Sequence, residues 1–534
     1  MSSVSEHVDS LVGCMGKNPL QILIAIQKAY NYVPIDTVER LARNLDLPIT
    51  QILGDVEFYR FLSKEPLGDY NILMSDNITD WMMGSRDLHS RLCKNLQGTG
   101  GVSTGKTSCT GMCDQGPALL VNGIAVTNLD EARIDAIVDL VKKGIPVSSW
   151  PSEYFHVESN IRRSSWLFES TKGDFLEGDA LLAELAASNL RGRGGAGFPT
   201  ARKWASCRDA RGKERFVVCN ADEGEPGTFK DRVLLEHRTK ALLDGMALCA
   251  GIIGAKKGFL YVRGEYRHLE HHLEKMLDER RPNDFEIELH WGAGAYICGE
   301  ESALLESIEG KRGIPRVRPP FPVTHGLWGM PTVVDNVETF CAAASIAGGG
   351  GESFRNLGTA QSKGTKLLSI SGDCSKPGIY EYPFGASIED ILRECGGGNP
   401  LAVQVGGAAG TCLDSSEFGR RIGFEDLSTS GSVMIFGENR DMREAALNFS
   451  GFFAQESCGF CTPCRVGTGV IEQIMERISD GQRADVVEIG DLGNILMASH
   501  CGLGHSAARA VRDMLKKFPA HFGLLGRELE GALS

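Results

Sequence analysis

The sequence lacks the features of membrane-spanning, exported and nucleic-acid-binding proteins. Its longest uncharged apolar run, from Met246 to Ala255, is too short to cross a bilayer. The stretch from Met1 to Cys14 has no basic, apolar signal-peptide layout. A net charge of -13 and the lack of any basic stripe with interleaved aromatic residues argue against a nucleic-acid partner. We therefore expect a cytoplasmic protein with no transmembrane segment.

Cysteine, in contrast, is plentiful, with 16 residues in a chain of 534. Because there is no export layout, we expect these cysteines to stay reduced, as thiols or metal ligands, and not to form a disulfide framework. The length leaves room for about three or four domains.

Changes in hydrophobic pattern divide the chain into four predicted parts, and the expected fold class is multidomain α/β. Residues 1–148 are expected to form a helical bundle followed by a compact α/β domain. Residues 176–355 form the large middle domain. Short apolar runs around one helix predict a small α+β domain at 356–440, and the pattern of 441–534 is helical.

The middle domain begins with a glycine-rich loop, Leu-Arg-Gly-Arg-Gly-Gly-Ala-Gly-Phe-Pro-Thr at 190–200. Gly192 and Gly194 let backbone amides approach an anion or a flat ring, and Arg193 and Lys203 add positive charge. The loop fits Gly-x-Gly-x-x-Gly but follows a helical stretch, so we do not expect a standard Rossmann crevice. A tight surface loop is the alternative. We interpret the loop as a phosphate and cofactor cradle.

Three further stretches suit a dinucleotide bound beside a second cofactor. A predicted buried strand runs into Asn-Ala-Asp-Glu-Gly-Glu-Pro-Gly at 220–227. A second glycine-rich turn at 292–301 ends in paired carboxylates, and a proline-stiffened segment holds Arg318 and Phe321 in fixed positions. Carboxylates accept hydrogen bonds from ribose hydroxyls, aromatic side chains stack on flat rings, and arginine binds phosphate.

The helical carboxyl-terminal part carries a cysteine motif. Cys458, Cys461 and Cys464 have the Cys-x2-Cys-x2-Cys spacing that wraps one side of an iron-sulfur cubane, and Cys501 can complete it from a distant turn. A structural zinc with four cysteines is the competing interpretation, although it usually has two separated Cys-x2-Cys pairs.

The amino-terminal α/β domain contains a second, smaller cysteine group. Cys109 and Cys113 are close enough to share one metal centre, but two thiols make only half a site. The preceding residues 100–107 match the P-loop expression. We do not expect triphosphate binding there, because that mechanism needs a buried strand before the loop and a helix after it.

Together these motifs closely resemble those of the flavin-bearing subunit shared by respiratory complex I and by the diaphorases of NAD-linked hydrogenases and formate dehydrogenases. The resemblance runs from about Leu190 to Gly504 and includes Gly-Glu-Glu-Ser-Ala-Leu and Glu-Ser-Cys-Gly-Phe-Cys-Thr-Pro-Cys-Arg beside the stretches above. It implies a ubiquitin-like (SLBB) domain at 356–440 and a 4Fe-4S cluster on the four cysteines of the carboxyl-terminal part.

The same resemblance implies two groups of cofactor-binding residues. FMN is implied to lie around Gly192, Arg193, Gly194, Lys203, Asn220, Asp222, Glu223, Gly299, Glu300 and Asn336. NADH is implied to stack over the flavin near Phe198, Glu225, Glu301, Arg318 and Phe321.

The amino-terminal part resembles the family's thioredoxin-like partner subunit, here fused in front. That partner binds a 2Fe-2S cluster through Cys-x4-Cys followed by Cys-x3-Cys. Its second pair corresponds to Cys109 and Cys113, but Ser75 and Asp80 stand at the first pair. Oxygen ligands suit a sulfide cluster less well than thiolates, so an oxygen-ligated 2Fe-2S cluster and no cluster both stay open. Cys93, on a predicted helix, is a possible substitute ligand.

The fusion, these departures and the stretch 371–381 most resemble the diaphorase subunit of a soluble NAD-reducing nickel-iron hydrogenase. This implies hydride exchange between NAD(H) and FMN, then single-electron transfer to the 4Fe-4S cluster. The implied partners are an iron-sulfur electron-transfer subunit and a hydrogenase module. No side-chain acid or base is required, so we expect no catalytic residue. The alternatives are the diaphorase of an NAD-dependent formate dehydrogenase, a complex I module, and a noncatalytic electron-transfer scaffold.

Overall fold

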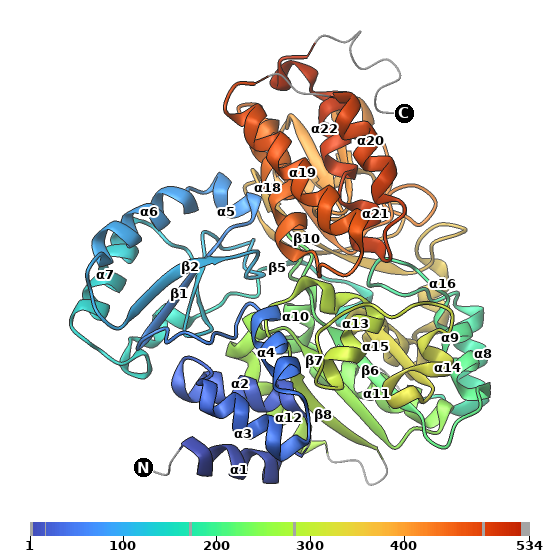
Figure 1. Cartoon of the computed structure of the whole chain (residues 1–534). Coiled ribbons are helices and arrows are strands. Elements are labelled where there is room, and N and C mark those ends of the chain that lie inside the picture. The colour runs from blue at the N-terminus through green and yellow to red at the C-terminus, as the bar shows by residue number, and fades with distance from the viewer. Residues whose placement is uncertain (1–3, 17, 170–173, 281–284, 483–485, 525–534) are drawn as a thin grey trace.

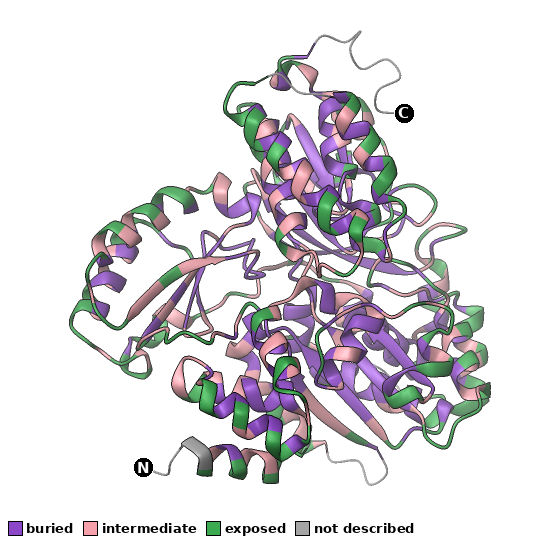
Figure 2. Cartoon of the chain, in the orientation of Figure 1, coloured by how far each residue is buried: buried purple, intermediate pink, exposed green. Residues whose placement is uncertain are grey.

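A computed structural model describes residues 4–16, 18–169, 174–280, 285–482 and 486–524. Figure 1 shows three lobes, which are an α/β lobe around β1, a large lobe around β6 to β8, and a lobe that ends in helices α18 to α22. Buried residues run through the interior of all three lobes (Figure 2). The expected multidomain α/β class is confirmed, with a thioredoxin-like domain in front.

The amino-terminal helices pack on the central lobe. They are α1 (Val4–Met15), α2 (Pro19–Tyr30), α3 (Ile35–Leu45) and α4 (Ile49–Phe58). Asn18 caps α2 with its side-chain oxygen and donates its amide to the carbonyl of Ile308, at 2.8 Å. Gln21 donates to the carbonyl of Trp291 at 3.0 Å. These hydrogen bonds between distant segments fix the amino-terminal bundle against the central domain.

The thioredoxin-like domain has a four-stranded sheet of order β2-β1-β3-β4. Its elements are β1 (Tyr70–Ser75), α5 (Ile78–Met82), α6 (Ser85–Leu96), β2 (Val102–Thr107), β3 (Leu119–Val121), β4 (Ile124–Val126) and α7 (Glu131–Lys142). Asn122 and Gly123 join β3 to β4 with positive φ values of 50° and 82°, as a tight hairpin requires. The stretch that matches the P-loop expression forms the edge strand β2 and not a phosphate-binding turn.

The central domain is a parallel sheet of order β8-β7-β6-β9. Its strands are β6 (Phe216–Ala221), β7 (Lys257–Val262), β8 (Glu286–Trp291) and β9 (Thr332–Asn336). Its helices are α8 (Gly178–Ala187), α9 (Thr200–Asp209), α10 (Lys230–His237), α11 (Thr239–Ile253), α12 (Glu270–Glu279), α13 (Glu301–Ile308), α14 (Pro322–His325), α15 (Val337–Ser345) and α16 (Gly351–Asn356). Because the strands are parallel, their carboxyl ends meet at one edge of the sheet.

A six-stranded sheet of order β13-β12-β14-β10-β11-β5 forms the next domain. Its elements are β10 (Thr365–Gly372), β11 (Gly378–Pro383), α17 (Ile388–Cys395), β12 (Ala402–Val405), β13 (Thr411–Asp414) and β14 (Ser432–Phe436). The edge strand β5 (Ile161–Arg163) precedes the central domain in sequence, so the sheet ties two distant segments together.

The carboxyl-terminal helices are α18 (Met442–Glu456), α19 (Thr462–Ser479), α20 (Val486–Leu496), α21 (Gly502–Ser506) and α22 (Arg509–Lys517). Pro463 lies in the first turn of α19, where a missing N–H costs no helical hydrogen bond. In the part of the chain that the structure describes, no helix is both long and apolar enough to cross a membrane.

Candidate flavin cavity and iron-sulfur sites

A cavity of about 380 Å³ opens at the carboxyl edge of the central sheet. This volume lies within the range of small-molecule sites. The ends of β6 and β9 contribute Asn220 and Asn336 to its wall, and the segments after β6 and before α13 contribute much of the rest. Of the residues predicted for FMN and NADH, those that line it are Gly194, Asn220, Asp222, Glu223, Glu225, Gly299, Glu300 and Asn336.

The glycine loop forms one wall of this cavity. It follows a helix, as expected, and the amide of Gly192 donates to the carbonyl of Phe198 at 2.9 Å, which closes the loop on itself. A Cβ atom on Gly194 would lie 3.3 Å from Cβ of Asn336. Gly195 has a φ of +133°, which L side chains rarely adopt. Gly194 and Ala196 line the cavity, so the loop presents backbone and one small methyl group to it.

Three carboxyl groups that follow β6 line the cavity and are desolvated by burial. Burial raises the pKa of Asp222 to about 8, and that of Glu223 and of Glu225 to about 7. Glu223 accepts from the amide of Asp231 and from the hydroxyl of Tyr266. Oδ2 of Asp222 is buried and has no hydrogen-bond partner. Such an orphaned acceptor fits the hydroxyl groups of a bound ligand.

Paired carboxylates at the start of α13 lie beside a cation. Glu300 caps the helix by accepting from the amides of Ser302 and Ala303, both at 3.0 Å. The guanidinium of Arg318 lies 3.2 Å from Glu300 and 3.4 Å from Glu301. Phe321, three residues after Arg318, leaves 54% of its surface exposed. This edge offers a charged group and an open ring to a second ligand.

Several predicted residues lie outside the cavity wall. The guanidinium of Arg193 is buried between the rings of Phe354 and Phe384 and donates to the carbonyl of Lys363. Lys203 donates to the carbonyl of Val334 at 2.8 Å. Phe198 is exposed by 45%. Gly192, Glu301, Arg318 and Phe321 also do not line this cavity.

Other lining residues were missed by the sequence analysis. They are Ala196, Gly224, Thr228, Lys230, Asp231, Tyr296, Ile297, Ser430, Gly502 and Leu503. Lys230 and Asp231 open helix α10 directly after the predicted acidic stretch, so their position was a usable indication. Ser430 and Leu503 belong to later domains, and no local pattern identifies them.

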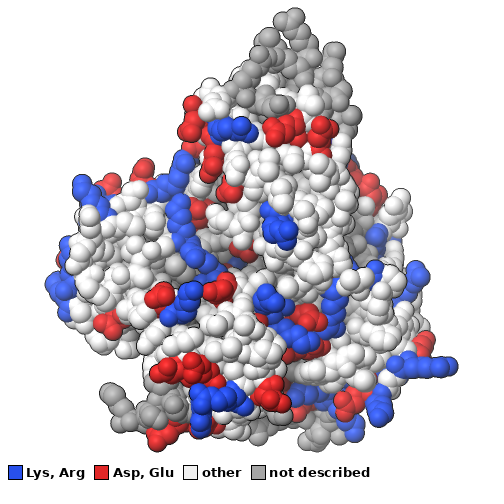
Figure 3. All heavy atoms as spheres, in the orientation of Figure 1, with Lys and Arg blue, Asp and Glu red and all other residues white. Residues whose placement is uncertain are grey.

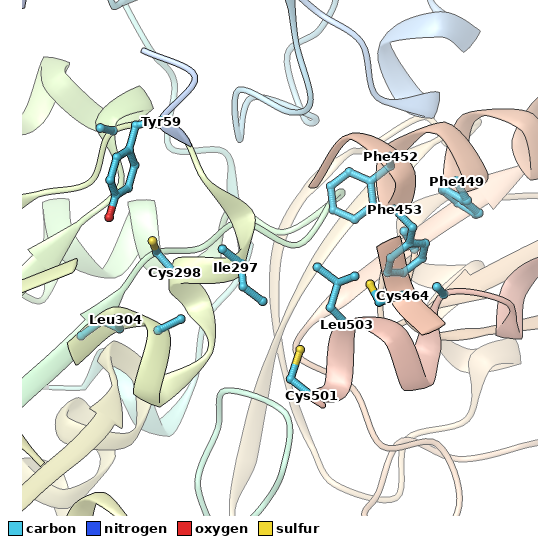
Figure 4. Close-up of a cluster of buried hydrophobic side chains, with 14 of the residues drawn as sticks. Tyr59, Ile297, Cys298, Leu304, Phe449, Phe452, Phe453, Cys464, Cys501 and Leu503 are labelled. Atoms are coloured by element: carbon cyan, nitrogen blue, oxygen red, sulfur yellow. The ribbon is translucent and has the colours of Figure 1, made fainter. Parts of the chain in front are cut away.

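All four predicted cluster cysteines line one small enclosed cavity, together with Ile297, Pro315, Ser457, Phe460, His500 and Leu503. Figure 4 shows the side chains of Cys464 and Cys501 near Leu503. A tetrahedral zinc would hold its thiolates at about 2.3 Å and so bring the sulfur atoms to within about 4 Å of one another. Within the described ranges, no group of three or more His, Cys, Asp or Glu is placed to hold a single metal ion. Four cysteines around one cavity, three of them with Cys-x2-Cys-x2-Cys spacing, are the usual ligand set of a 4Fe-4S cubane.

Comparisons with known proteins agree with this geometry. Residues 185–345 match the Nuo51 FMN-binding domain, residues 12–142 a thioredoxin-like [2Fe-2S] ferredoxin, and residues 444–524 the NADH-ubiquinone oxidoreductase-F iron-sulfur binding region. The NAD-reducing hydrogenase HoxS subunit alpha of Cupriavidus necator is 38% identical over 94% of this chain and 90% of its own length. The chain belongs to this family of hydrogenase subunits.

Other relatives of these hydrogenase subunits share only part of the chain. An NADH-quinone oxidoreductase subunit of Aquifex aeolicus is 41% identical, over 62% of this chain and 82% of its own length. A solved structure titled NAD+-reducing [NiFe]-hydrogenase in the H2-reduced state contains a similar chain, at 40% identity and a TM-score of 0.88. The match covers 96% of this chain and 93% of that one. The family resemblance inferred from the motifs is thereby confirmed.

FMN and the 4Fe-4S cluster of this family of hydrogenase subunits fit the residues present here. The orphaned Oδ2 of Asp222 and the side-chain-free wall at Gly194 suit a flavin with hydroxyl groups. The four thiols around one cavity suit the cubane.

The thioredoxin-like domain of this chain does not offer the same fit to a 2Fe-2S cluster. Ser75, Asp80, Cys109 and Cys113 do converge, with the two sulfur atoms 3.6 Å apart and the hydroxyl of Ser75 2.7 Å from Asp80. The side-chain amide nitrogen of Asn77 lies among them, 2.7 Å from Asp80, 3.1 Å from Cys109 and 3.4 Å from Cys113.

The polar groups of this pocket satisfy one another. Both oxygens of Asp80 accept hydrogen bonds, one from Ser75 and Asn77 and the other from the amide of Ala118 at 3.0 Å. Burial raises the pKa of Asp80 well above its ordinary value, so its carboxyl group is a poor anionic ligand. Cys93 lies apart, with its sulfur 3.4 Å from the hydroxyl of Thr104. The usual ligand set of a 2Fe-2S cluster is four Cys or His side chains. This pocket offers two thiols, and the side-chain amide of Asn77 occupies its centre, so the residues do not fit the cluster.

Proposed function

We propose that this chain is the diaphorase subunit of a cytoplasmic NAD-reducing nickel-iron hydrogenase. In this role it exchanges hydride between NAD(H) and FMN and delivers electrons through a 4Fe-4S cluster to an iron-sulfur subunit and a hydrogenase module. FMN, when bound, links two-electron hydride transfer to one-electron transfer.

One observation carries this proposal: the flavin cavity and the cavity of the four cysteines share two wall residues, Ile297 and Leu503. Figure 4 shows Ile297 approaching Leu503 and Cys501 from the opposite lobe. The flavin cavity and the cysteine cavity adjoin and are separated by apolar side chains. This arrangement suits the transfer of electrons between two bound cofactors, while ligands and water stay on their own side. A noncatalytic scaffold would not need the glycine wall or the orphaned carboxylate.

The protein contributes binding, orientation and electrostatics. We assign the backbone of the glycine loop and the side chains of Asn220, Asp222, Glu223 and Asn336 to the flavin. Phe198, Glu225, Glu301, Arg318 and Phe321 are assigned to NADH, with Arg318 near the phosphates and Phe321 against a flat ring. Lys203 and Arg193 are assigned an indirect role in flavin binding. Lys203 holds strand β9 through the carbonyl of Val334, and Arg193 fixes the glycine loop. We assign no side chain as a proton donor or acceptor in hydride transfer.

The test is anaerobic purification followed by addition of NADH. We expect bound FMN, bleaching of its absorbance by NADH, and reduction of an artificial one-electron acceptor. Substitution of Cys461 by serine should leave bleaching intact and slow acceptor reduction, because the exit cluster is lost. A protein that binds no FMN even when FMN is supplied would contradict the proposal. Co-purification with a formate dehydrogenase subunit, and not a hydrogenase subunit, would contradict the assigned partner.

A further inference from the structure

Two arginines connect the thioredoxin-like domain to the wall of the flavin cavity. Arg263 follows β7 at the carboxyl edge of the central sheet and leaves only 4% of its surface exposed. Its guanidinium donates to the carbonyl of Glu223 at 2.5 Å and to the carbonyl of Cys109 at 2.6 Å. Glu265 neutralises it at 2.8 Å. One buried side chain therefore joins the backbone of a cavity residue to the cysteine loop.

The second arginine fixes the same loop from helix α10. Arg232 is fully buried, donates to the carbonyl of Gly111 at 2.6 Å and pairs with Asp114 at 3.0 Å. Its own backbone amide donates to the carboxylate of Glu223 at 3.2 Å. The loop at 109–114 and the cavity residue thus share both arginines.

Tyr266 adds a third connection. Its hydroxyl donates to Glu223 at 2.8 Å, and its ring lies directly against the cysteine loop. A Cβ atom on Gly111 would lie 2.6 Å from this hydroxyl oxygen. Gly111 has a φ of +73°, so both its backbone conformation and the available space require glycine. Any displacement of the loop is therefore transmitted to Tyr266 and then to Glu223.

We propose that the cysteine loop of the thioredoxin-like domain, residues 109–114, positions Glu223 in the flavin cavity through Arg263, Arg232 and Tyr266. These three are positioning residues and not catalytic ones, because none of them lines the cavity. The loop keeps this task whether or not the domain holds a cluster. The inference rests on the proposed function, since it assigns the cavity to the flavin.

The mildest test is Tyr266→Phe in the full chain, because it removes one hydroxyl and keeps the ring. We expect FMN to bind about tenfold more weakly, because the carboxyl group of Glu223 loses one of the donors that hold it in place for the flavin. We also expect the flavin midpoint potential to shift, because the carboxyl group of Glu223, whose pKa burial raises to about 7, loses a donor that stabilises its charged form. A tenfold difference between the affinities for oxidised and reduced flavin corresponds to about 30 mV for a two-electron couple.

The matched control is Tyr380→Phe, which removes a buried hydroxyl that donates to the carbonyl of Lys376 in the six-stranded domain. We expect it to change neither flavin affinity nor flavin potential. Gly111→Ala probes the connection from the loop side and should shift the flavin potential in the same direction as Tyr266→Phe. If Gly111→Ala does not fold, Arg263→Lys takes its place, since lysine keeps the charge but bonds only one of the two carbonyls.

The experiment distinguishes failure of the proposed function from failure of the positioning inference. If wild-type protein binds no FMN, the proposed function fails. If wild-type protein binds FMN but Tyr266→Phe retains wild-type flavin affinity and potential, the positioning inference is wrong and the function stands. The 4Fe-4S EPR signal should be unchanged in every variant, which excludes general unfolding as the cause of a flavin effect.

Discussion

The side-chain amide nitrogen of Asn77 lies 3.1 Å from the sulfur of Cys109, inside the pocket where a thioredoxin-like ferredoxin would hold its iron. The other end of the same amide is fixed, because its oxygen accepts from the backbone and hydroxyl of Thr79 at 2.7 and 2.6 Å. Asn77 also caps helix α5, so it cannot leave the pocket without loss of that cap. The pocket is a satisfied polar core. Figure 3 shows the charged side chains, in contrast, spread over the outer surface of the lobes.

The first prediction concerns iron. We expect about four irons and four sulfides per chain, which is the content of a single cubane. Cys109→Ser should leave the iron content and the EPR spectrum unchanged, whereas Cys461→Ser should remove both. Iron analysis and EPR after NADH addition check this. About six irons, with a second EPR signal that disappears in Cys109→Ser, would contradict it.

A second prediction concerns the orphaned carboxylate. Asp222→Ala should weaken FMN binding by about 10- to 100-fold, because a buried hydrogen bond of about 1–3 kcal/mol to a ligand hydroxyl is lost. Fluorescence titration of flavin-free protein measures this affinity. The control is Asp179→Ala, whose side chain is 93% exposed and lies on helix α8 away from the cavity. Equal affinities for the two variants would show that Asp222 does not bind flavin.

A third prediction separates nucleotide binding from chemistry. Phe321→Ala should raise KM for NADH by about fivefold with little change in kcat, because an aromatic stacking contact of about 1 kcal/mol is lost in both ground and transition states. Steady-state kinetics with an artificial acceptor check it. Val317→Ala, a change of a 68% exposed residue on the same segment, is the control. A fall in kcat with constant KM would place Phe321 in a different role.

A fourth prediction concerns pH and stability. Burial raises the pKa of Asp55 to about 7, although the charge and the backbone of Arg312 act to lower it. Between about pH 4 and 7 the folded chain then binds more protons at this site than the unfolded chain, so stability falls as the pH rises through this window. Above about pH 7 the penalty is constant. Asp55→Asn should therefore stabilise the protein at about pH 8 by about 2–4 kcal/mol and have little effect near about pH 4.

Thermal melting of the variant and wild type at a series of pH values checks this expectation. Asp36→Asn, on the exposed face of helix α3, should show no such pH dependence. A constant difference between Asp55→Asn and wild type across the series would contradict the raised pKa of Asp55.

Many of the helices and strands could be predicted from local sequence patterns. The part at 441–534, which is expected to be helical, holds helices α18 to α22, and the helical stretch expected before the glycine loop is α8. The buried strands of the central sheet were visible because parallel strands covered on both faces are continuously apolar, as at Val217 and Val218. The contact of the amino-terminal bundle with Trp291 and Ile308 was not visible, since it joins segments far apart in the chain.

The sequence by itself determined the chemistry that this protein has available: a glycine-rich loop, carboxylates after a buried strand, and cysteines with cubane spacing. These are local patterns, because each cofactor needs particular residue types at short spacing. Only the tertiary structure decided which of them meet. It directed Arg193 away from the cavity, brought Leu503 between the flavin and the cluster cavities, and placed Asn77 among the thiols. Such contacts depend on the packing of whole domains, which no local spacing encodes.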